Sequence, residues 1–389
     1  MDGAKFAKML SDKHLFELDR MEYKYSVSSV NEFTELLRQN FAQSLPLVDF
    51  SSDELFYLPN LARISTNGMK QLLSAPASNQ SFGLQAMTEE IHATFQIESI
   101  HSSRNSIRHI LNGYAPRNEE ESRIYGMKRG LDFIADRQNT ITEENLHQLY
   151  QISTGDYLPD EDRLLPDHFY RHDVVYVVDG EESREELPAQ QLPDAMKRLV
   201  DFANAKDGIN ELHKAAILHF AFAYYHPYFD GNGRTARLLH LWYLVQQGYP
   251  AALFTPFSRY IAESKAAYYK AYDRVEKNAL ISGYTDVTPF LSYFCNEVYN
   301  RLQVDAAPPQ ADLQVYQTAL AEGKITEKER LLWEYVLSAY GTEEFTTKQL
   351  EKDFRNAAYA TIRTFVMKFH EMELLVARKT GNRVFYKVK

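Results

Sequence analysis

Apolar residues recur every three to four positions along most of this chain, the spacing that gathers them on one face of an α-helix. The period predicts helices over residues 30–41, 53–61, 87–111, 119–135, 192–205, 211–225, 234–247, 327–340, 347–354 and 356–372. Clean two-residue alternation is found in only two places, so we expect a mainly α protein with small β-hairpins.

The two alternating stretches differ in character. Residues 173–180 form a short β-branched run that ends in a turn, and they predict one arm of a hairpin in the middle of the chain. Two short strands around Thr380 and Asn382 predict a second hairpin near the C-terminus.

The length of 389 residues predicts two or three domains. The proline pair at 308–309 would end a helix and stiffen a connection, so we place a boundary there. The expected units are an N-terminal helical region at 1–85, a central domain at 86–305, a linker at 306–324 and a C-terminal module at 325–389.

Composition narrows the function classes. The chain has 43 Lys and Arg against 53 Asp and Glu, a net charge of -10, which argues against a protein built wholly to coat nucleic acid or an anionic membrane. A single cysteine, Cys295, excludes an internal disulfide and favours the cytoplasm. We expect neither a signal peptide nor a membrane-spanning segment, because no apolar run is long enough.

The most unusual local sequence, residues 226–237, lies between two strongly helical stretches. Pro227 must stop the first helix. Gly231, Asn232 and Gly233 are residue types that accept positive φ, so consecutive N–H groups can turn inward as an anion-binding nest. This nest opens onto the N-terminus of the second helix, where negative charge is favoured and phosphates are commonly held.

Four side chains add chemistry to this nest. Arg234 and Arg237 are three residues apart on the second helix, on one face, and suit the oxygens of a polyphosphate. Asp230 provides a carboxylate for Mg²⁺, bound directly or through water. His226 titrates near neutral pH and suits proton removal from a hydroxyl group. The alternative is an ordinary helix–loop–helix turn whose glycines serve only the backbone geometry.

Residues 226–237 resemble the motif H-P-F-x-[D/E]-G-N-G-R-x-x-R of Fic-domain proteins. The one departure is Tyr228, where the family has Phe, and its hydroxyl needs a partner if it is buried. The resemblance extends over roughly residues 86–300, including residues 169–171 and 268–269.

The resemblance implies transfer of AMP from ATP to a Ser, Thr or Tyr hydroxyl of a protein, with release of pyrophosphate. It assigns proton removal to His226 and Mg²⁺ to Asp230. The α- and β-phosphates would lie on the nest and the outer phosphates between the two arginines. ATP and Mg²⁺ are thus the expected ligands.

Two further features of the family can be matched to this chain. The predicted hairpin corresponds to a flap that covers the nucleotide and pairs with the target peptide, and it includes Val177, Val178, Asp179 and Gly180. Tyr268 corresponds to a position near the adenosine.

Many Fic proteins carry an inhibitory helix with the pattern [S/T]-x-x-x-E-[G/N], whose glutamate pairs with the second arginine of the motif. Residues 94–99 fit this pattern, except that Ser99 replaces Gly or Asn. The resemblance therefore implies that Glu98 inhibits the enzyme. Without it, Glu98 would be interpreted as a solvated glutamate on an amphipathic helix.

The C-terminal module resembles a winged helix-turn-helix, with residues 356–372 as the recognition helix. Residues 325–389 hold 12 Lys and Arg against 9 Asp and Glu, a balance of +3. DNA binding and a protein-interaction role are equally compatible with so small a charge. The cations able to contact phosphates are Arg363, Lys368, Arg378, Lys379, Arg383 and Lys387.

The main hypothesis is a self-inhibited protein adenylyltransferase in the cytoplasm. Two alternatives stay open: a winged-helix transcriptional regulator whose central domain senses nucleotide, and an enzyme that removes AMP from modified proteins. The expected partners are ATP, an unknown target protein that can be the chain itself, and DNA through residues 325–389. A homodimer is left open, and no membrane association is expected.

Overall fold

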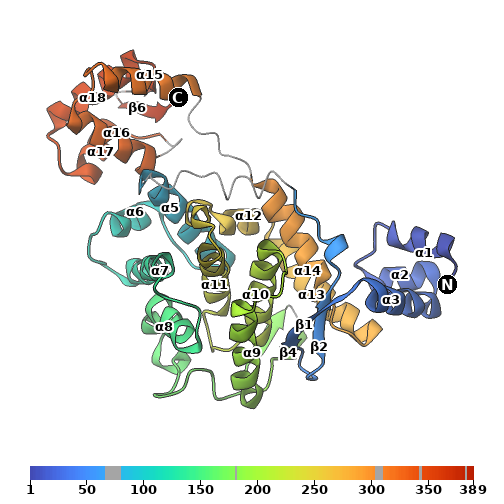
Figure 1. The fold of residues 1–389 in the computed structure, drawn as a ribbon. Helices are drawn as coiled ribbons and strands as arrows, with labels where there is room; N and C mark the ends of the chain where they lie inside the picture. The colour runs from blue at the N-terminus through green and yellow to red at the C-terminus, as the bar shows by residue number, and fades with distance from the viewer. Residues whose placement is uncertain (66–79, 180–181, 303–309, 341–343, 382) are drawn as a thin grey trace.

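The computed structural model describes residues 1–65, 80–179, 182–302, 310–340, 344–381 and 383–389, and within these ranges helices dominate (Figure 1). The mainly α expectation is confirmed. The longer helices are α1 Gly3–Leu10, α2 Leu18–Tyr25, α3 Val27–Phe41, α5 Gln80–Ile97, α6 Arg104–Leu111, α7 Glu119–Ala135, α8 Glu143–Ser153, α9 Leu192–Asn204, α10 Glu211–Tyr225, α11 Asn232–Gln246, α12 Phe257–Glu263, α13 Lys265–Ser282, α14 Thr288–Tyr293, α15 Gln310–Ala321, α16 Glu327–Ala339, α17 Thr347–Phe354 and α18 Tyr359–Glu371.

The strands of the described ranges form three antiparallel pairs. They are β1 Gln43–Val48 with β2 Glu54–Tyr57, β3 Tyr176–Asp179 with β4 Glu182–Glu185, and β5 Leu375–Thr380 with β6 Arg383–Val388. The second and third pairs are the two hairpins that the sequence predicts.

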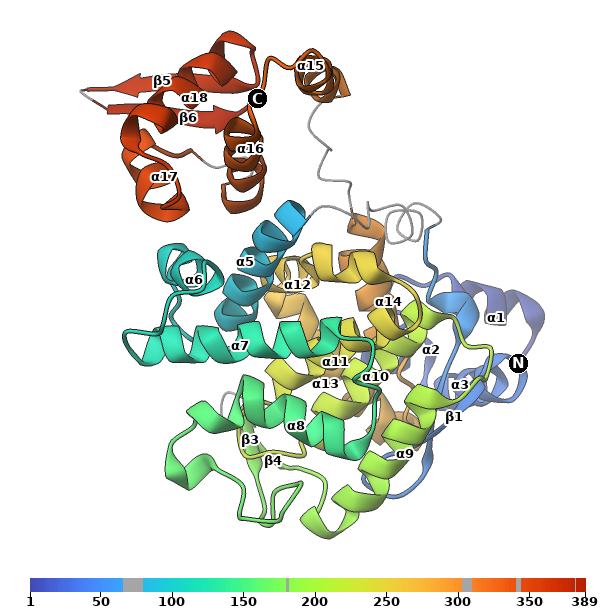
Figure 2. The same ribbon diagram turned by 60° about the vertical axis from the view of Figure 1, so that its left-hand side comes forward.

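Helices α10 and α11 form the centre of the largest core, with the other helices of the body arranged around them (Figure 2). Nearly every residue of both helices is buried, including positions that a surface helix would expose. A helix that is buried on every side needs neighbours on every side, and α7, α8, α9 and α14 are among those that supply them. The loop between α10 and α11 therefore joins two helices of the buried core.

The helix predicted over residues 87–111 is interrupted. Helix α5 ends at Ile97, and α6 begins only at Arg104, where the Ser103 side chain caps it by accepting a hydrogen bond from Ser106 N–H. Ser99 lies between them at φ 57°, a left-handed conformation that ends a helix. The prediction of one continuous helix is wrong, because apolar periodicity resumes in phase after the break.

The N-terminal region also departs from the helical expectation. Residues 53–61 contain strand β2 in place of a helix, and β2 pairs with β1. Leu45 and Leu47 on β1, and Leu55 and Tyr57 on β2, alternate inward in the manner of half-buried strands. Helices α1, α2 and α3 pack around a separate small core.

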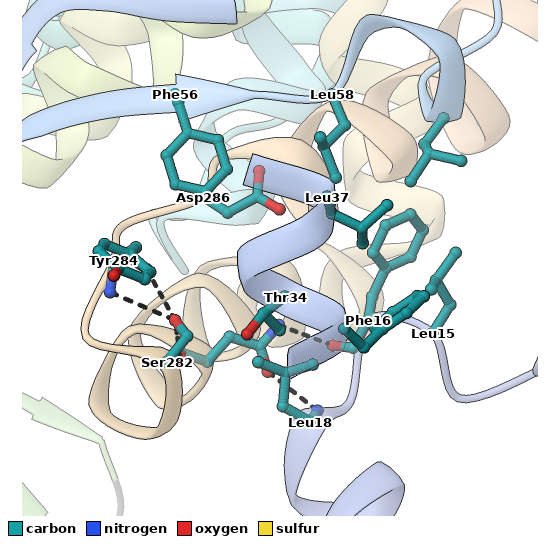
Figure 3. A pocket seen from close by; sticks show the side chains of 13 residues that line it. Leu15, Phe16, Leu18, Thr34, Leu37, Phe56, Leu58, Ser282, Tyr284 and Asp286 are labelled. Carbon is teal, nitrogen blue, oxygen red and sulfur yellow. Dashed lines mark hydrogen bonds between the residues drawn. The ribbon is translucent and has the colours of Figure 1, made fainter. Parts of the chain in front are cut away.

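The N-terminal helices are attached to the body through α13. The Asn278 side chain accepts a hydrogen bond from Leu18 N–H at 3.1 Å and donates one to the Phe16 carbonyl at 3.1 Å. A cavity of about 40 Å³ lies beside this contact, and apolar side chains from residues 15–61 dominate its lining (Figure 3). None of its lining residues belongs to the 226–237 loop, so the cavity belongs to the packing between the two units.

The C-terminal module has its own core and begins earlier than expected. Helix α15 lies in the stretch predicted as linker, and Ala319 packs into the core of the module. Helix α16 packs against α5 of the body. Nearby, Asn112 Nδ2 donates to the Tyr335 hydroxyl at 3.0 Å, and Arg355 Cζ lies 3.3 Å from the centroid of the Tyr114 ring. The proline pair that suggested the boundary lies outside the described residues.

Across the described ranges, no helix combines the length and apolar character needed to cross a bilayer.

Candidate functional site

The loop between α10 and α11 has the backbone that its sequence predicts. His226 ends α10 in the left-handed region at φ 51°, and Pro227 follows. Gly231 precedes α11 at φ 87° without a capping side chain. In the described part of the chain, the N–H groups of Asn232, Gly233 and Arg234 have no backbone partner. The N-terminus of α11 is therefore open to an anion.

The two glycines of this loop are required by close approach. A Cβ atom at Gly231 would collide with the Thr154 side chain, and one at Gly233 would collide with the carboxylate of Glu98. Asn232 has a different role from its neighbours. Its side chain accepts from Tyr228 N–H at 2.9 Å and donates to the Tyr228 carbonyl at 2.8 Å, so it holds the loop closed from inside.

The two arginines of the motif are buried and bind different carboxylates. Arg234 Nη2 donates to Asp230 Oδ2 at 2.7 Å. Arg237 Nη2 pairs with Glu98, and its Nε donates to Thr94 Oγ1 at 3.2 Å. The sequence predicts that both arginines point at one anion, whereas the structure brings each of them to its own partner.

Each arginine keeps one buried nitrogen with no hydrogen-bond partner among the described residues, Arg234 Nε and Arg237 Nη1. Buried guanidinium N–H groups without partners are rare in folded proteins and are costly. Oxygen atoms of a bound polyphosphate would satisfy both nitrogens.

Glu98 occupies the open end of α11. It follows the last residue of α5, and its carboxylate lies against Gly233 and Arg237. Burial alone would lower the pKa of Arg237, but the charge and hydrogen bond of Glu98, together with the charges of Tyr268 and Glu90, outweigh it and raise that pKa. The left-handed Ser99 stands where the family pattern has Gly or Asn, the residues that adopt this conformation most readily.

Arg171 contacts the site, and the sequence reasoning did not single it out. Its Nε donates to the His226 carbonyl at 2.8 Å, and its backbone N–H donates to the Pro227 carbonyl at 2.8 Å. The same guanidinium donates to the carbonyls of Asp173 and Leu187, which flank the β3–β4 hairpin. A fully buried arginine thus joins the hairpin to the histidine turn. The sequence offered one indication of this contact: Arg171 belongs to residues 169–171, which are part of the resemblance to Fic-domain proteins.

The hairpin expected to act as a flap is formed by β3 and β4. Val177, Val178 and Asp179 lie on β3, and Val178 pairs with Ser183 in an antiparallel register. Gly180, the fourth residue expected at the flap, lies outside the described residues.

Tyr268 lies beneath the Arg237–Glu98 pair. It is 3% exposed, and its hydroxyl is paired with His219 Nε2 at 2.8 Å, so the hydroxyl is already engaged within the core. Its neighbour Tyr269 is 45% exposed and feels the charges of Glu98 and Arg237. The accessible ring next to the site is therefore that of Tyr269, which the sequence reasoning noted only as part of a matched pair.

Asp230 has the properties of a magnesium ligand that works with phosphates. Its side chain is 52% exposed, with Oδ1 accepting from Gly231 N–H at 2.5 Å and Oδ2 from Arg234. Within the described ranges, no group of three His, Cys, Asp or Glu side chains is arranged to hold a metal. Mg²⁺ is commonly bound by one or two carboxylates together with substrate phosphates and water, and Asp230 fits this pattern.

Beside the loop, Tyr228 and Tyr150 stack with ring centroids 3.6 Å apart. Both hydroxyls are buried and have no partner in the part of the chain that the structure describes. Burial raises the pKa of Tyr228 well above its usual value, so the hydroxyl is held neutral. The family's Phe at this position would avoid the unpaired group. Tyr150 also lines a polar hollow of about 280 Å³ next to the loop.

Three histidines near the motif are structural. Each has one ring nitrogen engaged, His213 with the Ala62 carbonyl, His219 with Tyr268 and His240 with the Tyr299 hydroxyl. Burial lowers the pKa of all three, to about 3 for His240, and keeps the rings neutral. Burial likewise raises the pKa of the Cys295 thiol to about 12, so it is a poor nucleophile.

Comparison with known proteins gives this geometry a context. Residues 140–244 match the Fic/DOC family, so this part of the chain is a Fic/DOC domain. The chain is similar to the protein adenylyltransferase fic-1 of Caenorhabditis briggsae, with 25% identity over 181 residues covering 45% of this chain. It is also similar to the protein adenylyltransferase Fic of Nematostella vectensis, with 27% identity over 140 residues and 34% of this chain.

This chain spans only about a third of the length of these curated relatives, 31% in each case. Among solved structures, a Fic family protein from Desulfovibrio desulfuricans G20 has the same fold, with a TM-score of 0.52 and 17% identity. That match covers 84% of this chain and 97% of the other.

Proposed function

Since residues 140–244 form a Fic/DOC domain, we propose that this chain transfers AMP from ATP to a Ser, Thr or Tyr hydroxyl of a protein. One observation carries the proposal: at the N-terminus of α11 the N–H groups have no backbone partner among the described residues, and two buried arginines beside them each keep an unpaired nitrogen. Relatives named protein adenylyltransferase support this reaction over other uses of a phosphate site.

The chemistry follows from the positions of the groups. The target hydroxyl oxygen attacks the α-phosphorus of ATP, the bond from that phosphorus to the bridging oxygen breaks, and pyrophosphate leaves. His226, fixed at the entrance of the loop, accepts the hydroxyl proton. The N–H groups of Asn232 and Gly233 stabilise the charge that develops on the phosphate oxygens.

Arg234 and Arg237 would bind the outer phosphates through nitrogens that include their unpaired ones. Asp230 would hold Mg²⁺ together with those phosphates, and the ion would neutralise negative charge during transfer. On the opposite side, β3 offers backbone groups for a target peptide to add as a strand. The exposed ring of Tyr269 offers a stacking surface for the base.

The same arrangement is self-inhibited in our proposal. The Glu98 carboxylate pairs with Arg237 at the end of α11, where an outer phosphate of ATP would bind. ATP can then bind only with its triphosphate displaced, and the α-phosphorus is not presented to the target hydroxyl. Movement of Glu98 away from Arg237 is needed before transfer.

Transfer of label from ATP to protein tests the proposal in three variants side by side: wild type, Glu98→Gly, and Glu98→Gly combined with His226→Ala. We expect low transfer by wild type and an increase of about 10–10³-fold in Glu98→Gly, because a buried donor returns to the phosphates. The double variant should lose the gain. Equal label in the last two variants would contradict the assignment of His226 as the base.

Ser99→Gly is the matched control. It adds a glycine at the adjacent position, where φ is already 57°, and leaves the Glu98 carboxylate in place. We expect the Ser99→Gly variant to remain inhibited. Activation of this variant would mean that the higher transfer of Glu98→Gly comes from a more flexible backbone and not from loss of the carboxylate charge.

Mass spectrometry of protein incubated with mixed nucleotides and Mg²⁺ identifies the transferred group. An added AMP mass on a Ser, Thr or Tyr supports the proposal, and another nucleotide mass overturns the preference for ATP. If Glu98→Gly acquires no label and wild type releases AMP from a modified protein, the site removes AMP.

A further inference from the structure

The C-terminal module contains a helix–turn–helix followed by a hairpin. Helix α17 ends at Arg355, which is left-handed at φ 54°, and α18 begins four residues later at Tyr359. Strands β5 and β6 follow α18, and a bridge between Phe345 and Tyr386 ties the hairpin to the residues before α17. In proteins with this order of elements, the second helix enters the DNA major groove.

Charge is distributed unevenly within the module. Residues 359–389 carry seven Lys and Arg against two Glu, a balance of +5, whereas residues 325–358 carry five against seven. The acidic half includes α16 and α17, which lie between the hairpin and helices α5 and α6 of the body (Figures 1 and 2). The small overall charge of the module therefore conceals a basic side that points away from the body.

Several cations on this side are unpaired. Lys368, Arg378 and Lys389 form ion pairs within the module, with Glu329, Glu344 and Glu373. Of the remaining cations, Arg363, Lys379 and Arg383 are exposed and form no ion pair within the described ranges. Neither β5 nor β6 contains an acidic residue.

The outer face of α18 has the composition of a surface that reads bases. Tyr359, Arg363 and Met367 recur every four residues on one exposed stripe, with Tyr359 41% and Met367 49% exposed. Arginine can form two hydrogen bonds with guanine, and apolar atoms can contact the thymine methyl group.

We propose that α18 and the β5–β6 hairpin form a binding surface for duplex DNA, with α18 in the major groove and Lys379 and Arg383 on the phosphate backbone. This inference does not depend on the transfer reaction. An anionic membrane would match the charge but has no groove for the exposed stripe of α18. The order helix–turn–helix and hairpin favours duplex DNA over an acidic protein.

Binding of the full chain to a fluorescent 30-base-pair duplex across 50–200 mM KCl tests the proposal. Two phosphate contacts, by Lys379 and Arg383, predict a slope of log Kobs against log salt of about -2, which is a loss of about 12-fold over this range. Lys379→Glu with Arg383→Glu should weaken binding at least about tenfold and reduce the slope by about 2.

The control is Lys197→Glu with Lys206→Glu, which makes the same change in net charge at exposed positions of the body. We expect it to bind DNA like wild type. Equal weakening by both double variants would overturn the proposal, as would absence of duplex binding at 50 mM KCl. Binding to phosphatidylserine vesicles without duplex binding would assign the surface to a membrane instead.

Selection of duplexes from a random pool tests α18 separately. Wild type should enrich a sequence, and Arg363→Ala should lose about 10–100-fold discrimination at one base pair while retaining the salt slope within about one unit. If wild type and Arg363→Ala enrich the same sequences to the same extent, α18 does not contact the bases.

Discussion

Arginines lie in opposite environments in two regions of this protein. At the N-terminus of α11, Arg234 and Arg237 are about 3% exposed and are oriented by Asp230 and Glu98. On α18 and the hairpin, Arg363 and Arg383 are exposed and form no ion pair with described residues. The first pair is suited to one ligand in one geometry, whereas the second pair is suited to a long, uniformly charged one.

This difference in burial determines how strongly a single charge acts in each region. In the body, a buried cation interacts strongly with its neighbours because water screens it little, so the single carboxylate of Glu98 acts strongly on Arg237. In the module, exposed cations interact weakly one at a time, and their attraction for a polyanion grows with the number that lie on the same side. Net charge, which is -10 for the chain, describes neither region.

Replacement of one arginine from each region tests this comparison most directly. In the Glu98→Gly background, Arg237→Ala should lower AMP transfer by about 10²–10³-fold, because it removes a preorganised donor to the phosphates. Arg363→Ala should change transfer by less than about twofold. Initial rates with labelled ATP measure both, and similar losses in the two variants would mean that the regions are not functionally separate.

Arg171 tests whether the buried network holds the histidine turn. In the Glu98→Gly background, Arg171→Met should lower kcat by about 10²-fold through displacement of His226. It should also lower the free energy of unfolding by about 2–3 kcal/mol, because carbonyls lose a charged donor.

Two further variants separate positioning from general damage. Arg171→Lys retains the charge but not the fork of donors, so it should recover the free energy of unfolding more than it recovers kcat. Arg198→Met, an exposed arginine on α9, should change neither quantity. A loss of binding affinity for ATP with unchanged kcat in Arg171→Met would argue against a role at His226.

Salt should affect the two regions differently. Inhibition is measured as the ratio of AMP transfer by Glu98→Gly to AMP transfer by wild type. This ratio should change by less than about twofold between 50 and 200 mM KCl, because Arg237, one partner of the Glu98–Arg237 pair, is buried and little screened by salt. DNA binding should fall by about 12-fold over the same range. Loss of inhibition at 200 mM KCl would show that the pair is solvent-screened like a surface ion pair.

Much of the body follows from its sequence, and the exceptions have identifiable causes. Helix α7 begins and ends where predicted, and the helices on either side of residues 226–233 differ from prediction by at most two residues, since proline and glycine mark their ends. The break after Ile97 was missed because Ser99 adopts a left-handed conformation that serine seldom uses. Strand β2 was missed because its partner β1, not its own pattern, makes it a strand.

In the site too, some features follow from the local sequence and others depend on distant parts of the chain. The backbone of the loop is encoded locally by Gly231 and Asn232, and the sequence indicates it without any comparison. The partners of Arg237 are Thr94 on α5 and Glu98 just after it, more than 130 residues away along the chain. The contact of Arg171 with His226 likewise joins two separate segments. Such contacts are set by packing, and only resemblance to a family brought Glu98 into the prediction.

The smallest expected effect compares one buried tyrosine from each region. The Tyr228 hydroxyl has no partner among described residues, whereas the Tyr340 hydroxyl in the module donates to Asp353 at 2.7 Å. Tyr228→Phe should therefore raise the free energy of unfolding by about 1 kcal/mol, and Tyr340→Phe should lower it by about the same amount. Denaturant midpoints at unchanged m-values measure both. A loss of stability in Tyr228→Phe would mean that water or another group pairs with this hydroxyl, and that the loop is better satisfied than its protein contacts indicate.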